Sequence, residues 1–251
     1  MRDAEAKPGL DNVIAANTVL SHVDGEAGCL IIRGRNLENL AGHTSFEDAV
    51  ALLWQDYAPT TPDLAARIGA ARVRAHVRFT PLRPHLKGLT ATEAMRFLLS
   101  SIPDSTREDE PVEVLAAAGV AAPFAMRTVA DAHPVPPDAS LSHAADVLRM
   151  IRGTAGDAEE IRAFETYLVT VIDHGLNAST FAARVVASTA AGLPSSIVAA
   201  LCALKGPLHG GAPGPVLDML DGIGTADNAD AWIADALKRG ERLMGFGHRV
   251  Y

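Results

Sequence analysis

The sequence has few cysteines, few aromatic residues and no long apolar run, and each scarcity excludes a class of protein. Its two cysteines, Cys29 and Cys202, match neither C-x-x-C nor zinc-site spacing, so we expect no disulfide framework and no structural metal. No uninterrupted apolar run approaches the roughly 18 residues of a membrane span, and MRDAEAKPGLDN lacks the apolar core of a signal peptide. We therefore expect a cytoplasmic protein without a membrane partner.

Basic residues are outnumbered, with 22 Lys and Arg against 30 Asp and Glu, and the formal net charge is −8. Nucleic acids and anionic membranes are bound by clustered Lys and Arg, and the sequence has no dense basic stripe. Nucleic acid is therefore not an expected partner. A chain of 251 residues is long enough to form one large core or two smaller ones without disulfides or metals.

The apolar residues that are present recur mostly at three- and four-residue intervals, and aromatics make up only 5% of the chain. This pattern, with abundant alanine, predicts an all-α fold. Helices are predicted at 46–57, from 62, from 91, at 112–130 with an interruption at Pro123, at 141–151, from 158, and at 179–191, 195–204 and 230–239.

Local start signals support several of these helices. The Ser45 hydroxyl can cap the amide of Asp48, Thr61-Pro62 reads as another start, and 90–93 and 157–160 have capping-box spacing. The first helix should present one apolar face, and the helix after 157 a buried stripe. Their members are Phe46, Val50, Leu53 and Tyr57, and Ile161, Phe164, Leu168, Val171 and Ile172.

Three segments interrupt the helical pattern and predict a hairpin, a connection between helices and a hinge. Two short β-prone runs, 18–23 and 29–33, flank Asp24-Gly25 and predict a small hairpin. The segment at 131–137 should connect two helices, because AHPVPP cannot continue one. The GGAPGP segment at 210–215 is a candidate hinge between two domains.

Histidine occurs beside glycine or small polar residues in DHGLNASTF from 173, LKGPLHGGA from 204 and LMGFGHRVY from 243. Histidine exchanges protons near neutral pH, and glycine lets a ligand approach the backbone, so these segments are candidates for chemistry. Each histidine can equally cap a helix end or bind a core carbonyl. The remaining six are expected to be surface or structural residues: His22, His43, His76, His85, His133 and His143.

Several common motifs are absent. The GFG sequence lacks the third glycine of a dinucleotide-binding fingerprint, and neither H-E-x-x-H nor G-x-S-x-G occurs. The wide spacing of His174, His209 and His248 leaves a three-histidine metal site unsupported, so no metal is expected.

Taken together and in this order, the three histidine segments resemble the citrate synthase family. The amino-terminal segment GLDNVIAANTVLSHVDGEAGCLIIRGRNLENLA resembles the opening hairpin of that family. The resemblance implies a multi-helical large domain at 1–211 and the start of a smaller helical domain at 212–251, in a homodimer. It implies a transferase of the tricarboxylic acid cycle that condenses acetyl-CoA with oxaloacetate and releases citrate and CoA.

The resemblance also implies roles for individual residues. His209 would hydrogen-bond the acetyl carbonyl oxygen and stabilise the enol or enolate, and His248 would protonate the ketone oxygen of oxaloacetate. His174 would hold oxaloacetate, with Asn177 and Ser179 nearby, although both of these can simply cap the following helix.

The CoA thioester is the co-substrate, and no cofactor would be permanently bound. Main-chain groups of one segment would contact the CoA nucleotide: Leu243, Met244, Gly245, Phe246 and Gly247.

Two departures from the family pattern stand out. The family usually has Glu where this chain has Gly175, and it continues beyond Tyr251 to a D-P-R segment, an aspartate base and further arginines. Two alternatives stay open: a 2-methylcitrate synthase that uses propionyl-CoA, and a citrate-synthase-like protein that only binds a ligand if the chain ends at Tyr251.

Overall fold

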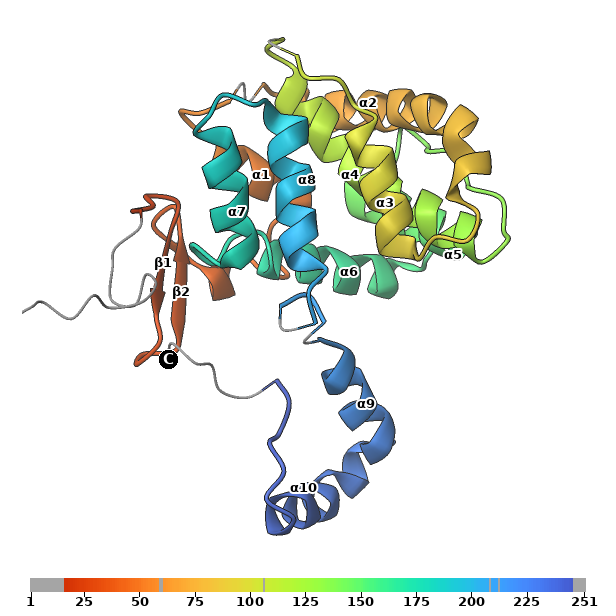
Figure 1. Ribbon diagram of the computed structural model, residues 1–251. Coiled ribbons are helices and arrows are strands. Elements are labelled where there is room, and N and C mark those ends of the chain that lie inside the picture. The colour runs from red at the N-terminus through yellow and green to blue at the C-terminus, as the bar shows by residue number, and fades with distance from the viewer. Residues whose placement is uncertain (1–15, 59–60, 106, 208, 212, 246–251) are drawn as a thin grey trace, which may run out of the picture.

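The computed structural model describes residues 16–245 except 59–60, 106, 208 and 212 (Figure 1). This part of the chain is mainly helical with one small sheet, which confirms the predicted all-α class. The strands are β1 (Ser21–Asp24), β2 (Cys29–Ile32) and β3 (Arg35–Asn36). The α-helices are α1 (Phe46–Trp54), α2 (Leu64–Phe79), α3 (Ala91–Ser100), α4 (Glu110–Val129), α5 (His143–Arg152), α6 (Ala158–Thr170), α7 (Ala178–Ala187), α8 (Leu193–Leu204), α9 (Pro213–Ile223) and α10 (Ala229–Lys238).

Helix α4 lies at the centre of the main core and packs against α2, α3, α5 and α8. Its length and its mean hydropathy of 1.4 would allow α4 to span a membrane. However, 50% of its most apolar 18-residue stretch is buried inside the protein. The predicted interruption at Pro123 is wrong, because α4 continues through this residue. Pro123 is buried within α4, and the helix continues although proline cannot donate the backbone hydrogen bond at this position.

The predicted helix caps are largely confirmed. The amide of Asp48 donates to the Ser45 hydroxyl at 3.1 Å, and Thr90 and Asp157 each begin a helix with a complete capping box. The start predicted at Thr61-Pro62 is wrong by two residues. Residues 61–63 form a turn in which the Leu64 amide donates to the Thr61 carbonyl at 3.0 Å, and α2 begins at Leu64.

The two predicted apolar faces are less buried than their spacing suggests. Helix α1 ends at Trp54, so Tyr57 lies beyond it and is 64% exposed. In α6 the fully buried residue is Val169, which is not a member of the predicted stripe, and Val171 is 46% exposed after the last helical residue.

The predicted hairpin is confirmed and extended by a third strand. β1 pairs antiparallel with β2, with Ser21 opposite Ile32 and Asp24 opposite Cys29, and β2 pairs with the short β3. Ile32 is buried in a small cluster with Leu40 and Val169, which attaches the sheet to α6. The sheet lies beside α7 (Figure 1).

A buried ion pair holds α2 to α5. Arg72 Nε lies 2.8 Å from Asp146 Oδ2, and both side chains are completely buried. Arg72 also donates to the Asp138 and Leu141 carbonyls, and Arg149 donates to the other oxygen of Asp146. These hydrogen bonds satisfy most of the buried polar atoms of the pair.

His143, the first residue of α5, is also buried in this region. Its ring stacks on Phe46 with centroids 4.7 Å apart, and its amide donates to Glu47 Oε1 at 2.6 Å. Burial, aided by the neighbouring Arg72 charge, lowers the pKa of His143 to about 3. This histidine is therefore structural, as predicted from its sequence context.

Helices α9 and α10 extend away from the other helices (Figure 1). Helix α9 begins at Pro213, inside the GGAPGP segment at 210–215, and Ala212 lies outside the described residues. The division of the chain between residues 211 and 212 stays a prediction.

Candidate active site

The loop between α6 and α7 places His174 at the surface of a cavity. Asp173 Oδ1 accepts the amide of Gly175 at 2.9 Å, which closes a tight turn around His174. Gly175 has φ +85°, a conformation that favours glycine, and a Cβ there would have no atom within 4 Å. A Glu at this position, as in the family pattern, would have space but a strained backbone.

Asn177 links this loop to α7. Its Oδ1 accepts the Thr180 amide at 3.0 Å, so Asn177 is the N-cap of α7, as one of the two alternatives predicted. Its Nδ2 also lies 3.3 Å from His174 Nε2, and a role of Asn177 in binding oxaloacetate stays a prediction. The cap fixes Oδ1 toward the helix and leaves the amide nitrogen facing the imidazole.

Ser179 connects Asn177 to the second predicted histidine. Its hydroxyl lies 2.7 Å from Asn177 Oδ1 and 3.0 Å from His209 Nε2. Because a serine carries one hydroxyl proton, it donates to one of these atoms at a time. Asn177 Oδ1 can only accept, so the 2.7 Å bond uses the serine proton, and His209 Nε2–H then donates to the serine oxygen. In the alternative state Ser179 donates to Nε2, and the proton of the neutral ring is on Nδ1.

Close backbone contacts after α8 hold His209 in place. The His209 amide donates to the Gly206 carbonyl at 3.0 Å, and the Gly210 amide donates to the Leu204 carbonyl at 2.8 Å. A Cβ on Gly210 would lie 2.1 Å from the Leu204 oxygen, and one on Gly211 would lie 2.9 Å from the Pro207 oxygen. The two glycines are therefore required for this tight turn.

The histidines share a cavity of about 920 Å³ between the sheet and the start of α7. His174, Asn177 and His209 line it, and so does His22 from β1. His22 is exposed, as predicted, but its place in this cavity was not predicted. Only the docking of β1 on the loop after α6 brings it there, and no local sequence signal marks that contact.

The third predicted histidine, His248, lies outside the described residues, as do Phe246 and Gly247. Leu243, Met244 and Gly245 are described, and they are not among the residues found to line the cavity. Gly245 has φ +87°, a conformation that favours glycine, and a Cβ there would lie 3.6 Å from Val216 Cγ2 of α9. In the described ranges, no group of three or more His, Cys, Asp or Glu residues could hold a metal ion.

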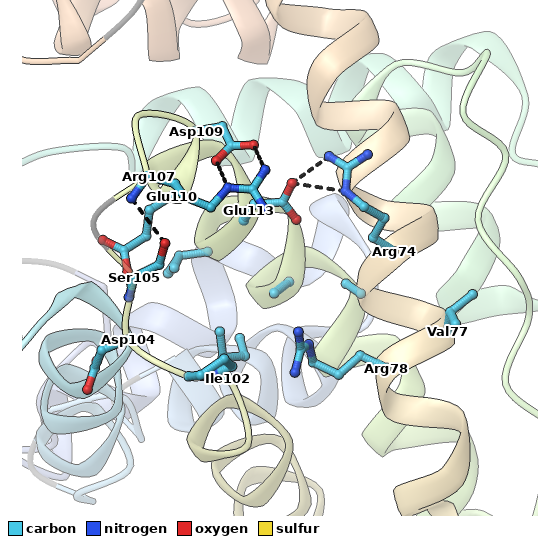
Figure 2. A pocket seen from close by; sticks show the side chains of 14 residues that line it. Arg74, Val77, Arg78, Ile102, Asp104, Ser105, Arg107, Asp109, Glu110 and Glu113 are labelled. Carbon is cyan, nitrogen blue, oxygen red and sulfur yellow. Dashed lines mark hydrogen bonds and ion pairs between the residues drawn. The ribbon is translucent and has the colours of Figure 1, made fainter.

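A second cavity, of about 760 Å³, lies between α2, α4 and the loop at 101–109 (Figure 2). Its charged side chains are largely paired with one another. Arg74 Nε lies 3.0 Å from Glu113 Oε1, and Arg107 binds the Asp109 carboxylate through two nitrogens, as Figure 2 shows. None of the predicted site residues lines this cavity. The cavity with the histidines is therefore the stronger candidate for an active site.

Comparison with known proteins extends over nearly the whole chain. Residues 9–251 match the family model described as citrate synthase, C-terminal domain. The chain is 36% identical to a citrate synthase of Haloferax volcanii, over 98% of this chain and 70% of that protein. It is 34% identical to 2-methylcitrate synthase 1 of Corynebacterium glutamicum, over 100% of this chain and 71% of that protein.

Solved structures agree with these sequence matches. A citrate synthase from Thermotoga maritima superimposes with a TM-score of 0.77 at 33% identity, over 97% of this chain and 68% of that one. The Thermoplasma acidophilum citrate synthase, solved with carboxymethyl coenzyme A and oxaloacetate, gives 0.78 at 27% identity, over 96% of this chain and 67% of that one. Sequence and fold lead to one conclusion: the chain belongs to the citrate synthase family.

Proposed function

We propose that the protein condenses acetyl-CoA with oxaloacetate and water to give citrate and CoA. One observation carries the proposal. His174 and His209, which are far apart in the sequence, line one cavity and are joined through Asn177 and Ser179. The reaction itself is inferred from membership of the citrate synthase family.

His209 is proposed to stabilise the activated acetyl group. Loss of a methyl proton to the aspartate that the family resemblance implies would place negative charge on the thioester oxygen. An imidazole Nδ1–H directed at that oxygen stabilises the charge as it forms, and a neutral ring suffices for this purpose. The ring proton would be on the substrate side in the state in which Ser179 donates to His209 Nε2 instead of to Asn177 Oδ1.

His174 and His248 are proposed to act on oxaloacetate. His174, oriented by Asn177, would hydrogen-bond the substrate, and His248 would protonate the ketone oxygen as the new carbon–carbon bond forms. Water then cleaves the citryl thioester, so the products are citrate and the free CoA thiol. The segment at 243–247 is proposed to contact the CoA nucleotide through its main chain.

Release of the CoA thiol tests this proposal. The protein should release thiol from acetyl-CoA only when oxaloacetate is present, and a control with oxaloacetate alone should give no signal. Binding of oxaloacetate without thiol release would favour the alternative of a non-catalytic binding protein. Absence of both would refute the proposed function.

Propionyl-CoA is a second candidate substrate, because several relatives of similar identity are named 2-methylcitrate synthase. The two thioesters differ by one methylene, which is worth about 1–3 kcal/mol of discrimination in an apolar pocket. A ratio of kcat/KM above one for propionyl-CoA over acetyl-CoA would assign the protein to that group.

We also propose a cytoplasmic homodimer, on the basis of the family resemblance. Several large apolar side chains are exposed in the single chain, including Val77 on α2 and Met126 on α4. Burial of such residues against a second copy would remove apolar area from water. Sedimentation should give twice the chain mass.

A further inference from the structure

We propose that Ser21, on strand β1, is a positioning residue for the loop that carries His174, and that it acts through Asp173. The inference rests on the proposed function only for the identity of the ligand that His174 holds. The structural claim is separate: a hydroxyl on the amino-terminal sheet sets the conformation of the 171–177 loop.

The contact is a direct hydrogen bond across 152 residues of sequence. The Ser21 hydroxyl donates to Asp173 Oδ1, and this same oxygen accepts the Gly175 amide at 2.9 Å. One carboxylate oxygen therefore joins the sheet to the turn that surrounds His174. Hydrogen bonds to an ionised carboxylate are among the stronger ones in proteins.

Ile172 anchors the start of the loop by packing against the clusters that contain Val50 and Ile32, and the other hydrogen bonds of the loop are local. The Ile172 amide donates to the Val169 carbonyl at 3.4 Å, and the Asn177 amide donates to the Gly175 carbonyl at 3.1 Å. In the described part of the chain, Ser21 supplies the only hydrogen bond that residues 171–177 receive from outside α6, α7 and their connection.

His174 needs this external support because its own side chain is exposed. Its Nε2 lies 3.3 Å from Asn177 Nδ2. Asn177 is fixed by its cap on α7, so a shift of the turn at Asp173 would move His174 relative to a stationary partner. Loss of the Ser21 hydroxyl should therefore weaken the pairing of His174 with Asn177.

A second contact between the same parts of the chain provides a control. Arg184 of α7 donates from Nη1 to the Asn17 carbonyl at 3.1 Å, just before β1. This bond holds the chain near α7 without touching Asp173. Arg184→Gln therefore tests general docking of the amino-terminal segment, whereas Ser21→Ala tests the bond to the loop.

Hydrogen exchange at the Gly175 amide gives a readout that needs no activity. In Ser21→Ala this amide should exchange about tenfold faster than in the wild type, and Ser21→Thr, which keeps the hydroxyl, should restore slow exchange. Ser188→Ala removes a hydroxyl that donates only within α7, to the Val185 carbonyl, and should leave Gly175 unchanged. If Ser21→Ala does not fold, Ser21→Cys, with its weak thiol donor, takes its place.

Steady-state kinetics provide the second readout. Ser21→Ala should raise the KM for oxaloacetate about tenfold with an unchanged melting temperature, whereas a purely structural role would lower the melting temperature and leave KM unchanged.

Unaltered Gly175 exchange in Ser21→Ala, or an equal effect in Arg184→Gln, would overturn the proposal. A wild type without oxaloacetate-dependent thiol release would refute the proposed function alone, since the exchange comparison would still decide the role of Ser21.

Discussion

Gly210 and Gly175 both lie next to a histidine of the candidate active site, but for different physical reasons. Gly210 is packed against the end of α8, where a Cβ would lie 2.1 Å from the Leu204 oxygen. Gly175 has open space around it and is constrained only by its φ of +85°. The first glycine fixes the position of His209, and the second allows the turn around His174.

Alanine substitution should separate these two roles. Gly210→Ala must displace the turn that holds His209, so kcat should fall by at least about tenfold. Gly175→Ala costs roughly 1 kcal/mol of backbone strain but meets no neighbour, so its activity should change less. Parallel measurements of kcat and melting temperature test whether Gly210→Ala is the more damaging substitution. A larger loss of kcat in Gly175→Ala would contradict this expectation.

Replacement of the histidines themselves tests their proposed roles. His209→Ala removes a donor to the developing enolate, and His248→Ala removes a general acid, so each should lower kcat by at least about 100-fold. His22→Ala is the matched control, because His22 lines the same cavity without a proposed chemical role. Rates near the wild-type value in His209→Ala would show that the enolate is stabilised elsewhere.

At the scale of secondary structure, α2 and α5 depend on the Arg72–Asp146 pair, which is fully buried. Arg72→Met would leave the buried Asp146 carboxylate with Arg149 as its remaining cationic partner, so the cost should lie near the lower end of the roughly 3–5 kcal/mol that is typical when a buried charge loses its partner. Arg72→Met should therefore lower the midpoint of thermal unfolding by roughly 10 °C. Arg107→Gln, which breaks an exposed pair with Asp109, should not measurably change it. Equal midpoints in the two variants would contradict this role for the buried pair.

Local sequence signals predicted many of the helix starts correctly, because a helix cap involves residues only three positions apart. The starts at Ser45, Thr90 and Asp157 are examples, and the two-strand hairpin is another. The continuation of α4 through Pro123 could not be predicted, since it depends on tertiary packing. The bond from Ser21 to Asp173 could not be predicted either, because it joins distant segments.

For the whole molecule, the buried His143 predicts acid sensitivity. Its pKa is about 3 in the folded chain, against an ordinary value of 6.5, so the unfolded chain binds the extra proton between these values. Stability from this residue is complete above pH 6.5 and is lost as the pH falls toward 3. The lowered pKa of carboxyls such as Glu93, held by the Thr90 cap, acts in the same direction.

Thermal unfolding between pH 7 and pH 4 checks this expectation. The midpoint should fall with decreasing pH in the wild type and fall less steeply in His143→Gln, which cannot titrate at this position. The carboxyl groups are the same in both proteins, so the difference in slope reports His143. Identical slopes would show that His143 does not contribute to acid sensitivity.

One cavity brings His174 and His209 together, and we propose that this pair serves to join an acyl-CoA to oxaloacetate. The most direct test is to incubate the protein with isotope-labelled acetyl-CoA and oxaloacetate and to identify the product by mass spectrometry. We expect labelled citrate, together with an equal amount of free CoA, and a loss of at least about 100-fold in the rate of His209→Ala. Citrate formed at the same rate by His209→Ala, or thiol release without labelled citrate, would contradict it.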